Sequence, residues 1–178
     1  YYDSVISEYF NNTNNNHFPQ KKTIHGNLVE VLRYGENPHQ KSAIYSKNNN
    51  LDILQLSGKK LSYNNFNDIY AALNISRTLP KNNGTVIVKH ANPCGVSVNS
   101  NRIDSYKEAL ACDPISAFGG IVSCNFKITK KLSLELNKIF FEVIIANGFE
   151  KDALKILKSK KNLRLIDASS YQENEQLT

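Results

Sequence analysis

The sequence TVIVKHANPCG, from Thr85 to Gly95, combines a strand signal with two adjacent basic side chains. Residues 85–88 are apolar or β-branched and lack helical spacing, which is typical of a strand buried on both faces. Lys89 and His90 follow at once, and Asn-Pro-Cys-Gly at 92–95 predicts a turn. The strand would therefore deliver an ammonium group and an imidazole to one end of a sheet, where open α/β sheets bind ligands. A strand with a polar end and an ordinary turn is the alternative that this stretch alone leaves open.

The length of 178 residues leaves room for one substantial domain, which buries roughly 70% of its unfolded surface. The sequence contains no methionine and begins at Tyr1, so we expect either a piece of a longer protein or a processed start. No run approaches the ~18 apolar residues of a membrane span. No signal-peptide pattern is visible either.

The formal net charge is +6, and much of the lysine surplus lies between Lys127 and Lys161. These lysines recur at helical intervals opposite apolar residues, with few aromatic residues among them. That pattern predicts a solvated face and disfavours a nucleic-acid interface. Cys94, Cys112 and Cys124 form neither a CxxC pair nor a metal-like set, so we expect free thiols in a reducing cytosol.

Apolar runs and helical patterns alternate along most of the chain. Helices are predicted at 1–10, from an N-cap at Asn67 or Asp68 to 79, and at 103–112, 129–141 and 150–157. Strands are predicted at 29–34, 43–45, 51–56, 85–88, 121–124, 143–146 and 163–166, with 43–45 and 51–56 forming a pair. This alternation predicts an α/β fold with a mostly parallel sheet and helices on both faces.

Two polar features lie where the first predicted strand ends. Arg33 is suited to bidentate recognition of phosphate or carboxylate, although a surface ion pair is the common alternative. Glu36 and His39 in the following turn could act as an acid/base pair. We favour the simpler interpretation, in which this turn only bonds to its own backbone.

Two further candidates border the later strands. Gly119 and Gly120 precede the strand at 121–124 and would let a backbone approach a ligand, although a tight turn explains them equally well. They match no phosphate-binding glycine motif. Glu142 enters the strand at 143–146 and needs a cationic partner or hydrogen-bond donors. Lys89 could be that partner, which would make Glu142 structural; a donor-rich ligand is the functional alternative.

Five blocks in order carry a family resemblance: LRYGENPHQ at 32–40, LSYNN at 61–65, VIVKHANPCG at 86–95, CDPISAFGGIV at 112–122 and EVIIA at 142–146. Together they closely resemble the transformylase region of the bifunctional purine-biosynthesis family. That family pairs aminoimidazole carboxamide ribonucleotide (AICAR) formyltransferase with IMP cyclohydrolase. The similarity spans nearly the whole chain; one departure is Asn147, where the family usually has proline.

The resemblance implies a cytidine deaminase-like, three-layer α/β/α fold. Residues 24–168 would form the first half of the transformylase region, after a linker helix and loop at 1–23 from a cyclohydrolase domain. Residues 169–178 would form a polar tail, and a second half carrying much of the folate site would follow. The resemblance also implies a cytoplasmic enzyme, homodimeric when intact, with no nucleic-acid or membrane partner.

The implied reaction transfers a formyl group from the co-substrate 10-formyltetrahydrofolate to the 5-amino group of AICAR, giving FAICAR in IMP biosynthesis. That amine is a poor nucleophile and needs a base, and histidine suits this role near neutral pH. By resemblance, His90 is the proton acceptor and Lys89 stabilises the oxyanion. The nucleotide-binding pair would be Arg33 and Tyr34, while Gly119 gives a backbone contact and Glu142 an acidic contact to substrate. Arg33, Lys89, His90 and Glu142 should then meet in one cleft.

Three alternatives remain at this stage. A zinc deaminase needs H-x-E and P-C-x-x-C, and neither sequence is present, so no metal is predicted. Cys94 could act as a nucleophile with His90, although no acyl-transfer motif supports it. The isolated fragment could also bind nucleotide or dimerise without catalysis.

Overall fold

A computed structural model describes residues 1–171; residues 172–178, most of the predicted polar tail, lie outside the described residues. The helices are α1 (Tyr2–Thr13), α2 (Tyr63–Thr78), α3 (Arg102–Cys112), α4 (Pro114–Ala117), α5 (Lys130–Leu136) and α6 (Lys151–Leu157). The strands are β1 (Asn27–Val31), β2 (Ala43–Ser46), β3 (Leu54–Ser57), β4 (Gly84–Lys89), β5 (Asn92–Val98), β6 (Ile121–Cys124), β7 (Val143–Ala146) and β8 (Arg164–Asp167). Within residues 1–171, no helix is both long and apolar enough to cross a bilayer.

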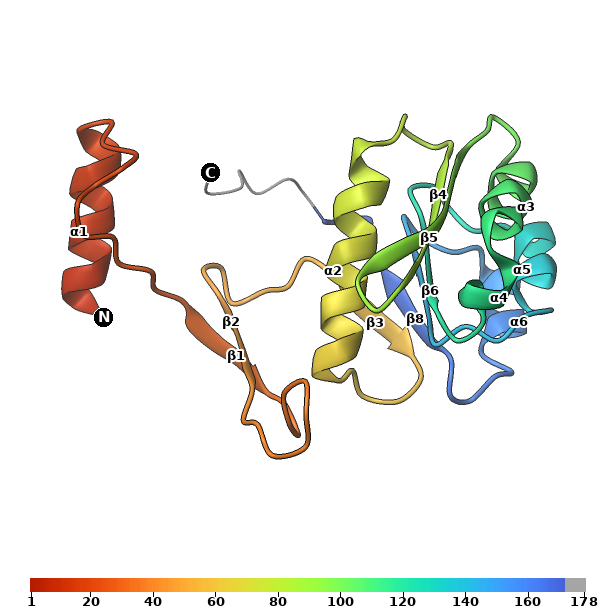
Figure 1. Cartoon of the computed structure of the whole chain (residues 1–178), viewed down its shortest axis with the longest axis horizontal. Helices are drawn as coiled ribbons and strands as arrows, with labels where there is room; N and C mark the ends of the chain where they lie inside the picture. Colours follow the sequence, from red (N-terminus) through yellow and green to blue (C-terminus); the bar gives the residue numbers. More distant parts are fainter. Residues whose placement is uncertain (172–178) are drawn as a thin grey trace.

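Six strands form one mixed sheet in the order β3-β8-β7-β6-β4-β5. Figure 1 shows this sheet on the right, with the β1–β2 ribbon and α1 on the left. The parallel pairing that the sequence predicts is confined to β6, β7 and β8. The other neighbours run antiparallel: β4 pairs with both β5 and β6, and β3 pairs with β8. The reason is that β4 and β5 form a hairpin, so the chain reverses where a crossover helix would have kept its direction.

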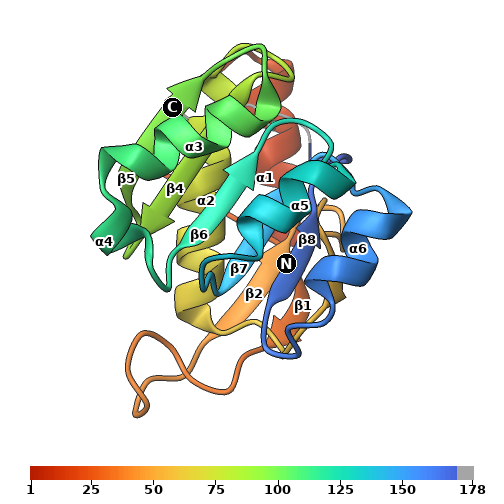
Figure 2. The ribbon, with the colours of Figure 1, turned by 90° about the vertical axis from the view of Figure 1, so that its right-hand side faces the viewer.

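Helices cover both faces of this sheet, as the sequence predicts, giving three layers. Figure 2 shows α3, α5 and α6 in front of the sheet and α2 behind it. Alternate residues of β4 enter different cores: Val86 and Val88 pack under α2, while Ile87 packs under α3 and α5. All three are fully buried, so the predicted strand buried on both faces is confirmed.

The predicted turn at 92–95 is wrong, because these residues begin strand β5. The reversal occurs one step earlier, at His90 and Ala91. Pro93 fits a strand here because β5 is at the edge of the sheet, where its missing N–H costs no ladder hydrogen bond. Cys94 is the extra residue of a β-bulge, since Ile87 pairs with Gly95 and Val88 with Pro93.

The predicted pairing of 43–45 with 51–56 is also wrong. β2 pairs instead with β1 in a separate two-stranded ribbon, and β3 pairs with β8 at the edge of the main sheet. The asparagine-rich segment between them marks a turn correctly. Local turn chemistry cannot show that the open edge of β8 is the better partner for β3.

Several helix ends differ from the prediction. α2 begins at Tyr63 because Ser62 and Asn65 form a reciprocal capping box, so neither Asn67 nor Asp68 is the N-cap. α5 ends at Leu136, five residues before the predicted end. Within the predicted tail, Tyr171 packs on Tyr70 and beneath the guanidinium of Arg77, so the ordered chain continues past Ala168.

Candidate functional site at one edge of the sheet

The candidate site begins with the two-residue turn that joins β4 to β5. His90 and Ala91 occupy this turn, and Lys89 pairs with Asn92 across it. The φ angles of His90 and Ala91 are 53° and 58°, as in a type I′ turn, which asparagine and glycine normally fill. A residue with a Cβ atom is disfavoured there by about 1–2 kcal/mol. Strained backbone of this kind clusters at functional sites, and here it projects an exposed imidazole.

Neighbouring groups hold the turn in this conformation. The backbone N–H of Ala91 donates to the Asp68 carboxylate at 2.7 Å, from α2. The side-chain amide of Asn92 donates to the carbonyl of His90 at 2.8 Å. These two bonds satisfy the polar groups that the reversal would otherwise leave unpaired.

Strand register brings three of the predicted site residues to the same edge of the sheet. Val88 pairs with Ile121, and Ile121 pairs with Val143. Lys89 is therefore the last residue of β4 at the edge where Gly119 precedes β6 and Glu142 precedes β7. Since adjacent strands lie about 4.8 Å apart, the backbones of Lys89 and Glu142 are on the order of 10 Å apart. This edge contains the amino ends of the parallel strands, because β4 runs against them, and not the carboxyl ends that the sequence suggested.

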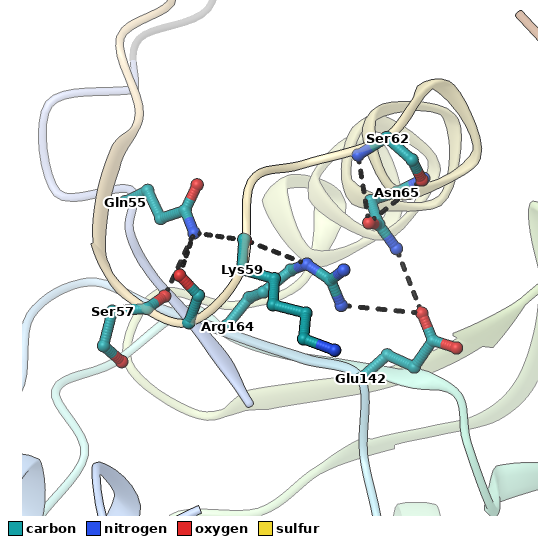
Figure 3. Close-up of polar contacts among 8 residues, drawn as sticks. Gln55, Ser57, Lys59, Ser62, Asn65, Glu142 and Arg164 are labelled. Carbon is teal, nitrogen blue, oxygen red and sulfur yellow. Dashed lines mark hydrogen bonds and ion pairs between the residues drawn. The ribbon is translucent and has the colours of Figure 1, made fainter. Parts of the chain in front are cut away.

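Lys89 is not the partner of Glu142. Its ammonium group donates instead to the carbonyl of Phe118 at 3.0 Å, in the loop before β6. Figure 3 shows the groups that hold Glu142: the Asn65 side-chain amide donates to Oε2 at 3.1 Å, and an Arg164 guanidinium nitrogen lies 3.8 Å from the same oxygen. Among residues 1–171, no contact falls on Oε1. Glu142 thus presents one free carboxylate oxygen on an exposed side chain.

Arg164 is itself fixed on the other side. Its Nε donates to the carbonyl of Lys59 at 3.1 Å, and the Gln55 amide binds the same carbonyl at 2.7 Å (Figure 3). Only 15% of the Arg164 side chain is exposed. The carboxylate of Glu142 therefore lies against a guanidinium that is held in place by hydrogen bonding, and not against a freely moving cation.

Arg33 and Tyr34 come from the loop after β1, in the separate ribbon. The Arg33 guanidinium carbon lies 5.7 Å from the centre of the Tyr34 ring. In the described part of the chain, no contact joins Arg33 to Lys89, His90 or Glu142. The meeting of all four side chains in one cleft stays a prediction; of the four, Lys89, His90 and Glu142 share the sheet edge.

The loop that carries Arg33 is closed by Gln40. Gln40 accepts at its carbonyl from Gly35 and at its side chain from Asn37, at 2.9 and 2.8 Å. Within residues 1–171, no contact joins Glu36 to His39. The simpler interpretation of this loop, self-bonding rather than an acid/base pair, is the one the geometry favours.

Gly119 needs glycine for its backbone conformation, with a φ of 74°. A Cβ there would meet only the Phe140 ring at an ordinary 3.8 Å, so space is not the constraint. Its N–H already donates to the carbonyl of Phe140 at 2.9 Å. The carbonyl of Gly119 is therefore the backbone group suited to a ligand.

Cys94 is poorly suited to be a nucleophile. Burial raises the pKa of its thiol above the ordinary value, and nearby Asp113 raises it further, although Lys89 opposes the change. The thiol donates to the carbonyl of Ile87 at 3.5 Å. A protonated thiol that points into the hairpin is weakly nucleophilic. Among residues 1–171, no three His, Cys, Asp or Glu side chains gather as a metal site.

Comparison with known proteins identifies the family. Residues 1–178 match the family model described as "AICARFT/IMPCHase bienzyme". The chain belongs to this family. Relatives called "Bifunctional purine biosynthesis protein PurH" include those of Caulobacter vibrioides, 45% identical over 93% of this chain, and Thermoanaerobacter sp., 43% identical over 98%. The chain spans about a third of their length, 32% and 35% respectively.

Sequence reasoning missed two polar residues of α2, Asn65 and Asp68. Asp68 was considered only as an N-cap and Asn65 only as part of the LSYNN block at 61–65, yet Asp68 contacts the His90 turn and Asn65 contacts Glu142. Their spacing of three along a helix was the available signal, since it places two polar side chains on one face. No local pattern could show which distant groups that face would meet.

Proposed function

We propose that this chain forms the first half of an AICAR transformylase region and supplies the proton acceptor of formyl transfer. The observation that carries this proposal is the strained His90 turn beside Lys89, at the sheet edge that also bears Glu142. Family membership over the whole chain supports it. We extend the proposal to the domain plan of the sequence: a linker at 1–23, a cytidine deaminase-like half at 24–168 and a polar tail at 169–178.

The reaction joins the 5-amino nitrogen of AICAR to the formyl carbon of 10-formyltetrahydrofolate. The amine lone pair is delocalised into the imidazole and carboxamide, so bond formation requires a base to remove a proton. The exposed imidazole of His90 takes that proton. Negative charge develops on the formyl oxygen, and the fixed ammonium of Lys89 stabilises it. Collapse then breaks the bond from the formyl carbon to N10 of the folate, which leaves with a proton.

Substrate binding falls to other groups in this proposal. Glu142 Oε1 accepts from an amine or amide donor of AICAR, because Oε2 is already held by Asn65 and Arg164. The Gly119 carbonyl is available for a backbone contact. Arg33, beside the Tyr34 ring, binds the ribonucleotide phosphate as a planar guanidinium suits. Among residues 1–171, no hydrogen bond or ion pair joins Arg33 to Lys89, His90 or Glu142, so the substrate would span the two parts.

We also propose the cellular location and the oligomeric state of the intact enzyme. The three cysteines are free thiols, which agrees with a reducing cytoplasm. We propose that the intact protein is a homodimer with IMP cyclohydrolase activity as well, acting on folate and AICAR without a metal in this region. For the isolated chain, nucleotide binding without catalysis is the second candidate, because the chain spans only about a third of its relatives.

The experiment compares His90→Ala and Arg33→Ala in a full-length family enzyme that carries this chain. His90→Ala should lower turnover by about 10²–10⁴-fold, the usual contribution of a general base, with little change in AICAR affinity. Arg33→Ala should chiefly weaken AICAR binding, measured by calorimetry. Turnover of His90→Ala close to that of the unchanged enzyme would remove His90 from the mechanism. Unchanged affinity in Arg33→Ala would remove the phosphate role.

A further inference from the structure

The first contact to consider joins α2 to the turn that carries His90. Asp68, in the second turn of α2, accepts the Ala91 N–H at 2.7 Å, a short bond to a charged acceptor. Ala91 and His90 both hold positive φ angles that their side chains disfavour. A turn in this conformation persists only when surrounding groups determine it. Asp68 is the group from outside the hairpin that does so.

The second contact joins the same helix to Glu142. Asn65 lies in the first turn of α2 and is 5% exposed. Its oxygen is occupied by the backbone N–H and hydroxyl of Ser62, at 3.1 and 3.0 Å, so the amide orientation is fixed. The NH₂ group therefore points at Glu142 and donates to Oε2 at 3.1 Å (Figure 3). This bond leaves Oε1 facing away from the network.

The two residues stand three positions apart, which places them on one face of α2. The same buried side of the helix is anchored in the core by Phe66, Ile69 and Ala72, which are at most 7% exposed. A helix held in this way is rigid, so the distance between its two polar contacts is nearly constant. Both contacts lead to residues to which the proposed function gives a role.

We propose that the first two turns of α2 form a positioning platform for formyl transfer. Asp68 fixes the turn that presents His90, and Asn65 orients the Glu142 carboxylate toward AICAR. The inference rests on the proposed function of His90 and Glu142. The platform keeps the base and the acidic contact at a fixed separation, so the bound amine meets the imidazole in a reactive geometry. Asp68 and Asn65 are positioning residues, since neither is expected to touch the reacting atoms.

Loss of each contact should change a different kinetic parameter. In the full-length family enzyme carrying this chain, Asp68→Ala should lower kcat about 10–100-fold, as a base displaced by about 1 Å would, with the AICAR KM changed less than about threefold. Asn65→Ala should raise the AICAR KM about tenfold, with kcat changed less than about threefold, because a charge-assisted contact loses its orientation. A merely structural role would lower stability and shift both parameters together in both variants.

Matched variants separate positioning from folding. Asp68→Asn keeps an oxygen acceptor for the Ala91 N–H and should restore most of kcat. Thr129→Ala removes the side-chain cap of α5, where the hydroxyl accepts from the Leu132 N–H; as a control for stability alone, it should lower the melting temperature by about 2–4 °C and leave the AICAR KM unchanged. Asn67→Ala alters an exposed asparagine on another side of α2 and should change neither parameter.

A direct measurement on this chain completes the test. By amide hydrogen exchange, Asp68→Ala should lose at least about tenfold of the protection at Ala91, while the protection of the β6 and β7 amides stays unchanged. Unchanged exchange at Ala91 in Asp68→Ala would overturn the platform. So would a similar fall in kcat and a similar rise in KM in both Asp68→Ala and Asn65→Ala. His90→Ala is measured alongside. If His90→Ala loses turnover while Asp68→Ala and Asn65→Ala change kcat and KM in the same way as each other, the platform fails and the proposed function stands. If His90→Ala keeps turnover, the proposed function itself fails.

Discussion

Two residues of the β4–β5 turn adopt backbone angles that their side chains disfavour. His90 and Ala91 fill a turn that asparagine and glycine would fill at lower cost. An imidazole at this position stands clear of both strands and still lies next to Lys89. The accompanying thiol has the opposite character, because Cys94 is drawn into the hairpin by its bond to Ile87. Position within one short hairpin thus separates an exposed imidazole from a thiol that is turned into the hairpin.

Alkylation rates should follow this environment. In the native chain at pH 8, iodoacetamide should modify exposed Cys112 first and Cys94 more slowly, because burial raises the pKa of Cys94 and reduces its thiolate fraction. Cys124 is fully buried, and burial raises its pKa to about 12, so it should react only on unfolding. Mass spectrometry of timed samples gives the order, and the urea-unfolded chain, with three similar rates, is the control. Fastest reaction at Cys94 would revive the nucleophile hypothesis.

At the scale of elements, the closest packing joins β5 to α3. A Cβ built on Gly95 would lie 1.9 Å from the carbonyl oxygen of Ala109. No side-chain rotation can relieve this clash, because the backbone fixes the Cβ position and the carbonyl is itself backbone. Glycine at this position lets the helix lie directly on the edge strand. The packing of α3 in turn supports the hairpin that presents Lys89 and His90.

Gly95→Ala should therefore destabilise the chain by about 3 kcal/mol or more, at the upper end of overpacking effects. Urea denaturation followed by circular dichroism measures the loss. Val96→Ala, at the exposed neighbouring position of the same strand, should change the free energy of unfolding by no more than about 0.5 kcal/mol. A loss under about 1 kcal/mol for Gly95→Ala would mean that β5 and α3 can separate at little cost.

At the scale of the molecule, the described residues form two apolar cores around a sheet, and one edge of that sheet bears the proposed catalytic groups. Small-molecule sites usually enclose most of their ligand. Two cavities lie elsewhere, one beside α1 and one between the β1–β2 ribbon and α2, and neither is lined by Lys89, His90 or Glu142. His90 is exposed and the Glu142 side chain is 47% exposed, so the candidate site is open to solvent and we treat it as a half-site.

The chain alone should show no measurable formyl transfer, while a full-length family enzyme carrying it should be active. An open edge cannot exclude water or hold two substrates in line, so binding of AICAR to the chain should be weak. Calorimetric titration with AICAR and a spectroscopic assay with 10-formyltetrahydrofolate measure these two properties. Turnover by the 178 residues on their own would contradict the half-site.

Sequence patterns determined the elements that bury apolar residues. The run at 85–88 and the similar runs at 121–124 and 143–146 predict buried strands, and all three are confirmed. Such runs are informative because the apolar character of a strand buried on both faces is local. The placement of Lys89 and His90 at the end of one of these strands followed for the same reason.

Only the tertiary structure decided direction, neighbours and contacts. Asn-Pro-Cys-Gly carries turn signals, and it becomes a strand because the sheet edge tolerates a proline. Charge alone offers Lys89 as one possible partner of Glu142, whereas Asn65 and Arg164 hold it from elements far away in the chain. A residue's own sequence neighbourhood sets its burial and local conformation. Pairing between strands and bonds across the sheet depend on where distant segments finally pack, which no short stretch encodes.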